Sequence, residues 1–178
     1  MADPARQELW FFRDSSGRGE TSVFQGEGFS EESQRCVILV FHDPCALRLL
    51  ERTAHTDRFK AAVMGAGISH WLSFHGKSSL ADWDAIHYAE SPYELAGRFQ
   101  KFSPLSYHEN LKTPTLILHG AEDQDVPVEQ SYLFYRALKD QRVPTELIVY
   151  PREDHAVKER LHLLDMSRRV LAWFRQYL

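Results

Sequence analysis

The stretch that most constrains the fold is Thr115–Pro127, TLILHGAEDQDVP. It opens with a short apolar run between a proline and a glycine, which is typical of a buried strand. His119 and Gly120 end that strand, and a loop with Asp123 and Asp125 leads directly into a helical pattern. In open α/β sheets, loops at the carboxyl ends of strands are where ligands bind and catalysis occurs.

A second loop of the same kind lies downstream. Glu146–Tyr150, ELIVY, is another short apolar strand, and His155 follows it shortly before a long helix. In hydrolases an aspartate fixes the tautomer of a histidine and stabilises the imidazolium formed when the ring takes a proton. The order acid then histidine also matches α/β-hydrolases. Asp123 and His155 are therefore the candidate catalytic residues. Asp125 is a rival acid, or else a solvated carboxylate at a helix N-terminus.

The remaining pattern predicts an α/β fold. Apolar strands alternate with helical segments, which favours a mostly parallel sheet of about four or five strands with helices on both faces. The expected strands are 36–41, 61–65, 115–119 and 146–150, and the expected helices are 45–55, 128–139 and 159–178, with a further helix start at 91. Residues 1–35, rich in Gly, Ser and Glu, are expected to be irregular, with a strand or short helix at 8–13. Residues 36–178 would form the main domain.

Composition excludes several classes of function. The formal net charge of -4 gives no indication of nucleic-acid binding, and no apolar run approaches the length of a membrane helix. The N-terminus does not read as a signal peptide. Two cysteines make no disulfide framework, which favours a reduced, cytoplasmic protein. The histidines lack metal-ligand spacing and the glycines do not form a dinucleotide loop, so no metal and no cofactor are expected.

Four segments of this chain resemble one known family, the prolyl oligopeptidase family of serine peptidases, in its acylaminoacyl-peptidase and dipeptidyl-peptidase branch. They are HTDRFKAAVMGAGISHWLSF at 55–74, ESPYELAGRFQKFSPL at 90–105, HGAEDQDVP at 119–127 and the C-terminal segment from 131 to 178. The resemblance implies an α/β-hydrolase fold and hydrolysis of peptide bonds in short or N-acylated peptides. The oligomeric state stays open.

The same resemblance assigns roles to two residues. Asp123 matches the family's triad aspartate and His155 its triad histidine. The family usually has a glycine on each side of that histidine, whereas this chain has Asp154 and Ala156. These neighbours would tighten the loop or add a competing carboxylate.

The serine nucleophile of the family is missing. Its G-x-S-x-G motif, a sharp strand-to-helix turn that exposes the serine, occurs nowhere in the sequence. In one alignment Asp43 stands at the serine position. In another, His42 matches the histidine of the oxyanion-hole loop, Asp43 replaces a glycine of that loop, and the serine segment is skipped. Cys45 is a weak candidate nucleophile, since a thiolate could pair with His155, or it is a small buried side chain. Ser69 lacks the flanking glycines.

Three functions remain open from sequence. One is an active hydrolase of short or N-acylated peptides or of esters, which would need Cys45 or an activated water, although the missing serine favours a catalytically impaired or truncated form. The second is a non-catalytic α/β domain that binds a peptide or a partner chain, and the third is a partial product with no function of its own.

Two packing predictions can also be checked. Spacing predicts that Val128, Tyr132, Tyr135 and Leu138 form the apolar face of their helix. Arg152 and Glu153 are expected to make surface ion pairs worth under about 1 kcal/mol.

Overall fold

The computed structural model describes residues 9–10, 36–41, 59–80, 93–94 and 96–178, with the backbone alone at 9–10, 36–41, 96 and 98. Five strands form one sheet in the order β1-β2-β3-β4-β5, and every neighbouring pair is parallel. The strands are β1 (Leu9–Trp10), β2 (Cys36–Phe41), β3 (Phe59–Gly65), β4 (Thr115–Gly120) and β5 (Thr145–Tyr150).

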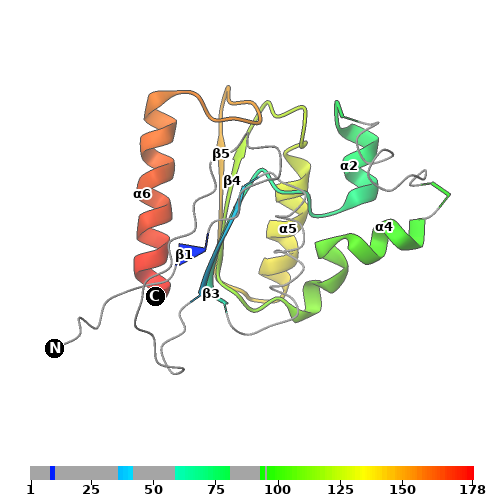
Figure 1. Ribbon diagram of the computed structural model, residues 1–178, viewed down its shortest axis with the longest axis horizontal. Coiled ribbons are helices and arrows are strands. Elements are labelled where there is room, and N and C mark those ends of the chain that lie inside the picture. The colour runs from blue at the N-terminus through cyan, green and yellow to red at the C-terminus, as the bar shows by residue number, and fades with distance from the viewer. Residues whose placement is uncertain (1–8, 11–35, 42–58, 81–92, 95) are drawn as a thin grey trace.

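Helices cover both faces of the sheet (Figure 1). Helix α6 (Arg160–Tyr177) packs on one face against β3 and β4, and α5 (Glu129–Asp140) packs on the other against β4 and β5. Helices α2 (Trp71–Lys77), α4 (Ala96–Phe102) and the 3-10 segment η2 (Pro104–Asn110) lie on the α5 side (Figure 1). The predicted fold class is therefore confirmed, and the four predicted strands agree with β2 to β5 within two residues.

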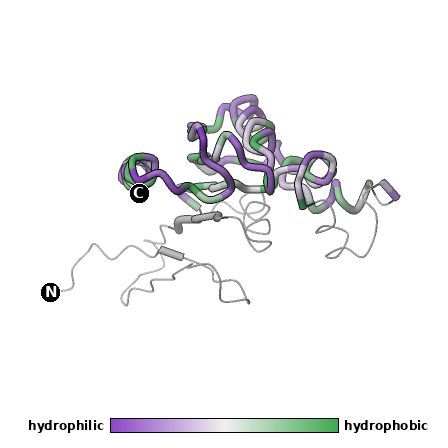
Figure 2. The backbone as a smooth tube through the Cα atoms, turned by 90° about the horizontal axis from the view of Figure 1, so that it is seen from above, coloured by the Kyte–Doolittle hydropathy of each residue, from purple (hydrophilic) through white to green (hydrophobic). Residues whose placement is uncertain are grey.

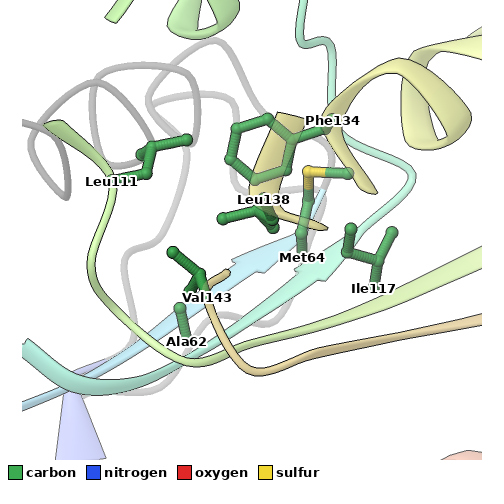
Figure 3. Close-up of a cluster of buried hydrophobic side chains, with 7 residues drawn as sticks. All are labelled: Ala62, Met64, Leu111, Ile117, Phe134, Leu138 and Val143. Carbon is green, nitrogen blue, oxygen red and sulfur yellow. The ribbon is translucent and has the colours of Figure 1, made fainter. Parts of the chain in front are cut away.

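Alternate residues of the central strands point to opposite faces, so both faces carry apolar side chains, as a parallel sheet between two helical layers requires. The cluster on the α5 side consists of Ala62, Met64, Leu111, Ile117, Phe134, Leu138 and Val143 (Figure 3). The cluster on the α6 side consists of Ala61, Val63, Leu116, Leu118, Tyr150, Trp173 and Phe174.

The buried face of α5 agrees with the prediction at Leu138, which is buried, and at Tyr135, which packs against the core, but it differs at Tyr132. Tyr132 is 48% exposed, while Gln130 and Ser131 are buried beside Phe134 and Leu138. Polar side chains can occupy a core position when their hydrogen bonds are satisfied, and both of these have partners. Hydrophobic spacing alone therefore missed the two polar residues on the buried face.

The C-terminal end of α5 is closed by a residue in the left-handed region. Arg142 has φ 59°, and the amide of Val143 donates to the carbonyl of Leu138, 2.9 Å away. Glycine is the residue that adopts this conformation without a steric penalty.

Around the circumference of α6, which Figure 2 shows end-on beside the C-terminus, hydrophobic and hydrophilic residues both occur. This mixture is typical of a helix that covers one face of a sheet. Within the described residues, no helix has the combined length and hydrophobicity to cross a lipid bilayer. Outside the described residues lie the predicted helix at 45–55 and the first residues of the helix expected to begin at 91. The same holds for most of the N-terminal segment that was expected to end at residue 35.

Candidate active site

The two loops singled out from sequence lie side by side at the carboxyl edge of the sheet. Strands β4 and β5 are parallel neighbours, and Gly120 at the end of β4 is in register with Tyr150 at the end of β5. Asp123 follows the first strand and His155 the second. Asp123 Oδ2 lies 2.8 Å from His155 Nδ1, so the structure brings these two side chains into direct contact.

Backbone contacts hold the loops together. The amide of Ala121 donates to the carbonyl of Tyr150, and the amide of Glu122 donates to that of Glu153, both at 2.8 Å. Gly120 makes this approach possible. A Cβ there would lie 2.8 Å from the carbonyl carbon of Glu153 and closer still to the backbone oxygens of Glu153 and Asp154. The side chain must therefore be absent at this position.

The Asp123 carboxylate is buried and fully hydrogen-bonded. Its Oδ1 accepts from the amides of Asp125 at 3.0 Å and Val126 at 2.8 Å, in a turn that leads towards α5. Its Oδ2 contacts His155 and also lies 3.1 Å from Nε2 of His119. Burial would raise the pKa of Asp123, but the hydrogen bonds from His119, His155 and Val126 outweigh burial and hold that pKa far below its usual range. The carboxylate is therefore charged at neutral pH.

The His155 imidazole is partly buried and is held by Asp123. Its side chain is 18% exposed, and Nδ1 donates to Asp123. In the neutral ring the proton is then on Nδ1 and Nε2 is basic, as in a general base. Burial would lower the pKa of His155, but the hydrogen bond and charge of Asp123, with the charges of Asp125 and Asp154, raise it. The competing carboxylate expected at Asp154 instead accepts from the backbone amide of His155, at 2.8 Å.

Sequence reasoning did not identify His119 and Ser131 as residues of the site. His119 is buried at the end of β4, with Nδ1 2.6 Å from the Ser131 hydroxyl and Nε2 2.7 Å from the carbonyl of Val126. The available signal was a histidine four residues before an acid. It pointed only to the end of a strand, because the partners come from α5 and from the loop after Asp123.

The histidine loop is anchored by a buried carboxylate. Glu153, 2% exposed, accepts from the amides of Lys158 and Glu159 and from Nδ1 of His162, at 2.7 to 2.8 Å. Burial would raise the pKa of Glu153, but these donors lower it. The predicted surface pair of Glu153 is therefore wrong. That of Arg152 is confirmed, since its guanidinium contacts Glu159 at 2.8 Å.

Among the described residues, one group has ligand atoms close enough to share a metal ion. Glu153, Glu159 and His162 place such atoms within 4.8 Å of one another. Backbone amides and Arg152 already bind these carboxylates, so hydrogen bonding and charge pairing account for the cluster.

The other candidates occupy different environments. Cys45 and the stretch with His42 and Asp43 lie outside the described residues. Ser69 is buried, and its hydroxyl donates to the carbonyl of Gln130 at 2.7 Å, so it packs against α5. Asp125 accepts from the hydroxyl of Ser79 at 2.7 Å through Oδ1, which directs it towards the segment after α2.

Comparison with known proteins identifies a family for this chain. Residues 48–178 match the prolyl oligopeptidase family. An uncharacterized peptidase, YuxL, of Bacillus subtilis (strain 168) is 37% identical over 130 residues, which cover 69% of this chain and 19% of the relative. The acylamino-acid-releasing enzyme of Arabidopsis thaliana is 28% identical over 194 residues, with 93% and 25% of the two chains covered.

Solved structures give the same placement. The acylaminoacyl peptidase of Pyrococcus horikoshii superposes with a TM-score of 0.74 at 25% identity, covering 82% of this chain and 24% of the other. This chain thus spans about a quarter or less of the relatives it matches. Because the family match covers well over half of the chain, this protein belongs to the prolyl oligopeptidase family.

Proposed function

We propose that this chain is a hydrolase domain for short or N-acylated peptides that keeps the acid and base of the catalytic centre but is catalytically impaired. The observation that carries the proposal is the 2.8 Å contact between the buried Asp123 carboxylate and Nδ1 of His155. In an intact centre the histidine takes the serine proton and the aspartate stabilises the imidazolium. Both groups have the charge and tautomer for these roles.

The serine motif is the part that the chain lacks, since no G-x-S-x-G occurs in its sequence. His155 could instead accept a proton from water as the water oxygen adds to the carbonyl carbon. The tetrahedral adduct would then expel the amine, which takes that proton. In a serine peptidase, loss of the serine alone lowers kcat by about 10⁶. We therefore expect very slow peptide cleavage and faster cleavage of activated esters.

The alignment with the Arabidopsis relative supports an internal difference in length. It runs over 194 positions, more than the 178 residues of this chain, so the relative has residues inside the matched region that this chain lacks. An omitted serine segment is consistent with that difference.

The names of relatives support the substrate class. Several matched proteins are acylamino-acid-releasing enzymes, and one similar structure is an acylaminoacyl peptidase in complex with Z-Gly-Gly-Phe-chloromethyl ketone, at 26% identity and a TM-score of 0.73. A short, N-blocked peptide is therefore the ligand that we propose for this chain. The low cysteine content supports a reducing, cytoplasmic location.

Alkylation by the same chloromethyl ketone tests the proposal without requiring a serine. A neutral imidazole nitrogen displaces chloride from the reagent, forming a C–N bond that mass spectrometry locates. We expect an adduct on His155 in the wild type, none on this site in His155→Gln, and slower labelling in Asp123→Asn. His108→Gln, a half-buried histidine on η2, is the matched control.

A serine-directed fluorophosphonate completes the test. We expect no serine adduct and no release of acetylalanine from an N-acetyl peptide within hours. Labelling of a serine, or rapid turnover of the peptide, would overturn catalytic impairment. Equal alkylation of every histidine would overturn the assignment of His155 as the poised base.

A further inference from the structure

We infer that His119 is a positioning residue, which shares the Oδ2 atom of Asp123 with His155 and fixes the carboxylate in the orientation that His155 needs. The inference deepens the proposed function, because it rests on Asp123 as the acid of the centre. The contact behind it is the 3.1 Å separation between His119 Nε2 and Asp123 Oδ2, with both side chains completely buried.

The partners of His119 determine which nitrogen carries its proton. The carbonyl of Val126 can only accept, and it lies 2.7 Å from Nε2, so Nε2 carries the hydrogen. The Ser131 hydroxyl, 2.6 Å from Nδ1, then donates to the unprotonated nitrogen. The Val126 carbonyl thus fixes the tautomer and the Ser131 hydroxyl supports it. The Nε2 atom that donates to Val126 also lies 3.1 Å from Asp123 Oδ2.

This N–H completes the restraint on the carboxylate. The terminal torsion of an aspartate is broad and nearly two-fold, so the two oxygens can exchange places at small cost. Backbone amides of Asp125 and Val126 hold Oδ1. Without His119, the only side-chain donor to Oδ2 among the described residues would be His155, which is the group that has to be positioned. His119 acts on Oδ2 independently of His155, so the carboxylate can be fixed before it positions His155.

The buried position of His119 is consistent with a role in hydrogen bonding. It ends a strand whose other side chains include Leu116, Ile117 and Leu118, all buried. A buried imidazole is destabilising unless its nitrogens are hydrogen-bonded, and both nitrogens of His119 are. The chain of contacts runs from Ser131 through His119 and Asp123 to His155, from helix α5 across two loops. Hydrogen bonds in such a buried network reinforce one another.

The test compares two substitutions at one position. His119→Leu removes the donor at similar size, whereas His119→Gln places an amide N–H near the position of Nε2. NMR follows two signals: the carboxyl carbon of Asp123 in an acid titration, and the Nδ1 proton of His155. We expect His119→Leu to raise the pH at which Asp123 begins to protonate and to broaden the His155 proton signal. His119→Gln should restore both.

A merely structural role would lower Tm without moving the Asp123 titration. A folded His119→Leu variant with both signals unchanged would overturn the inference. If that variant does not fold, Ser131→Ala serves instead, because it leaves Nδ1 of His119 without its donor and so weakens the tautomer with the proton on Nε2. We expect the same shift of Asp123 with smaller size, and an unchanged Asp123 would count against His119. Since neither signal needs substrate or turnover, failed alkylation of His155 and failure of this inference are separate results.

Discussion

The loop that carries the acid and the loop that carries the histidine are built differently. Both oxygens of Asp123 are bound by donors from the backbone of its own loop and from two imidazoles, and its side chain is completely buried. His155 is partly exposed. Backbone contacts hold its loop to the acid loop, and the Glu153 side chain holds it to the start of α6. The acid is therefore fixed by its own surroundings, whereas the histidine is placed by its neighbour. Disturbing the second loop should spare the first.

The largest effect is expected from Gly120→Ala. The new Cβ would overlap the backbone of Glu153 and Asp154, so the histidine loop has to move away from β4. We expect a loss of about 3 kcal/mol in the free energy of unfolding, measured with urea, together with loss of His155 alkylation. The turn around Asp123 should persist.

Gly76→Ala is the matched control, since nothing lies within 4 Å of a Cβ at that helical position. It should leave stability unchanged or raise it by up to about 1 kcal/mol. A Gly120→Ala variant as stable as the wild type would contradict the close contact between the loops.

A smaller effect is expected from Asp123→Asn. The amide keeps the shape of the carboxylate but places an N–H₂ group or a neutral oxygen among its donors. We expect a loss of about 2 kcal/mol in stability, measured by urea unfolding. Without the carboxylate charge, the pKa of His155 should fall. NMR titration of the His155 ring checks this, and an unchanged His155 titration would show that Asp123 is not its partner.

The pH dependence separates the two loops without mutation. The pKa of Asp123 is lower in the folded chain, so its stabilisation is present above the unfolded value of about 4 and is lost as pH falls. The pKa of His155 is raised, so its stabilisation is complete below about 6.5 and is lost as pH rises through the folded value. The contribution of this pair should therefore peak between these limits.

Thermal unfolding of wild type and Asp123→Asn across this range provides the measurement. The difference in Tm between the two proteins should be largest near pH 5 to 6 and should shrink towards pH 3 and pH 8. A difference that does not vary with pH would mean that the ionisation of the pair does not contribute to stability.

The smallest change in the free energy of unfolding is expected from a substitution that lies away from both loops, which serves as a reference for the larger changes. Arg142→Gly relieves a left-handed residue at the end of α5. We expect a gain of about 0.5 kcal/mol, because glycine adopts this conformation without penalty but adds entropy to the unfolded chain. Urea unfolding should show the gain while His155 alkylation stays at the wild-type rate. A loss of stability would mean that the Arg142 side chain contributes contacts that outweigh the strain.

Sequence sufficed for the features that depend on local pattern. Short apolar runs predicted β2 to β5, and the order of Asp123 and His155 predicted two loops at one edge. What it missed depends on tertiary partners. Gln130 and Ser131 are polar, so hydrophobic spacing excluded them from the buried face of α5 that they occupy. The burial of Glu153 depends on amides five and six residues away.

The amides of Ala121 and Glu122 continue the hydrogen-bond ladder of the sheet beyond the last residue of β4. Hydrogen exchange at these two amides consequently requires their hydrogen bonds between the two loops to break. Their exchange rates therefore measure how often the acid and histidine loops part in the resting protein, in the absence of any ligand. The exchange rates of the Ala121 and Glu122 amides thus report on the rigidity of the contact between the two loops.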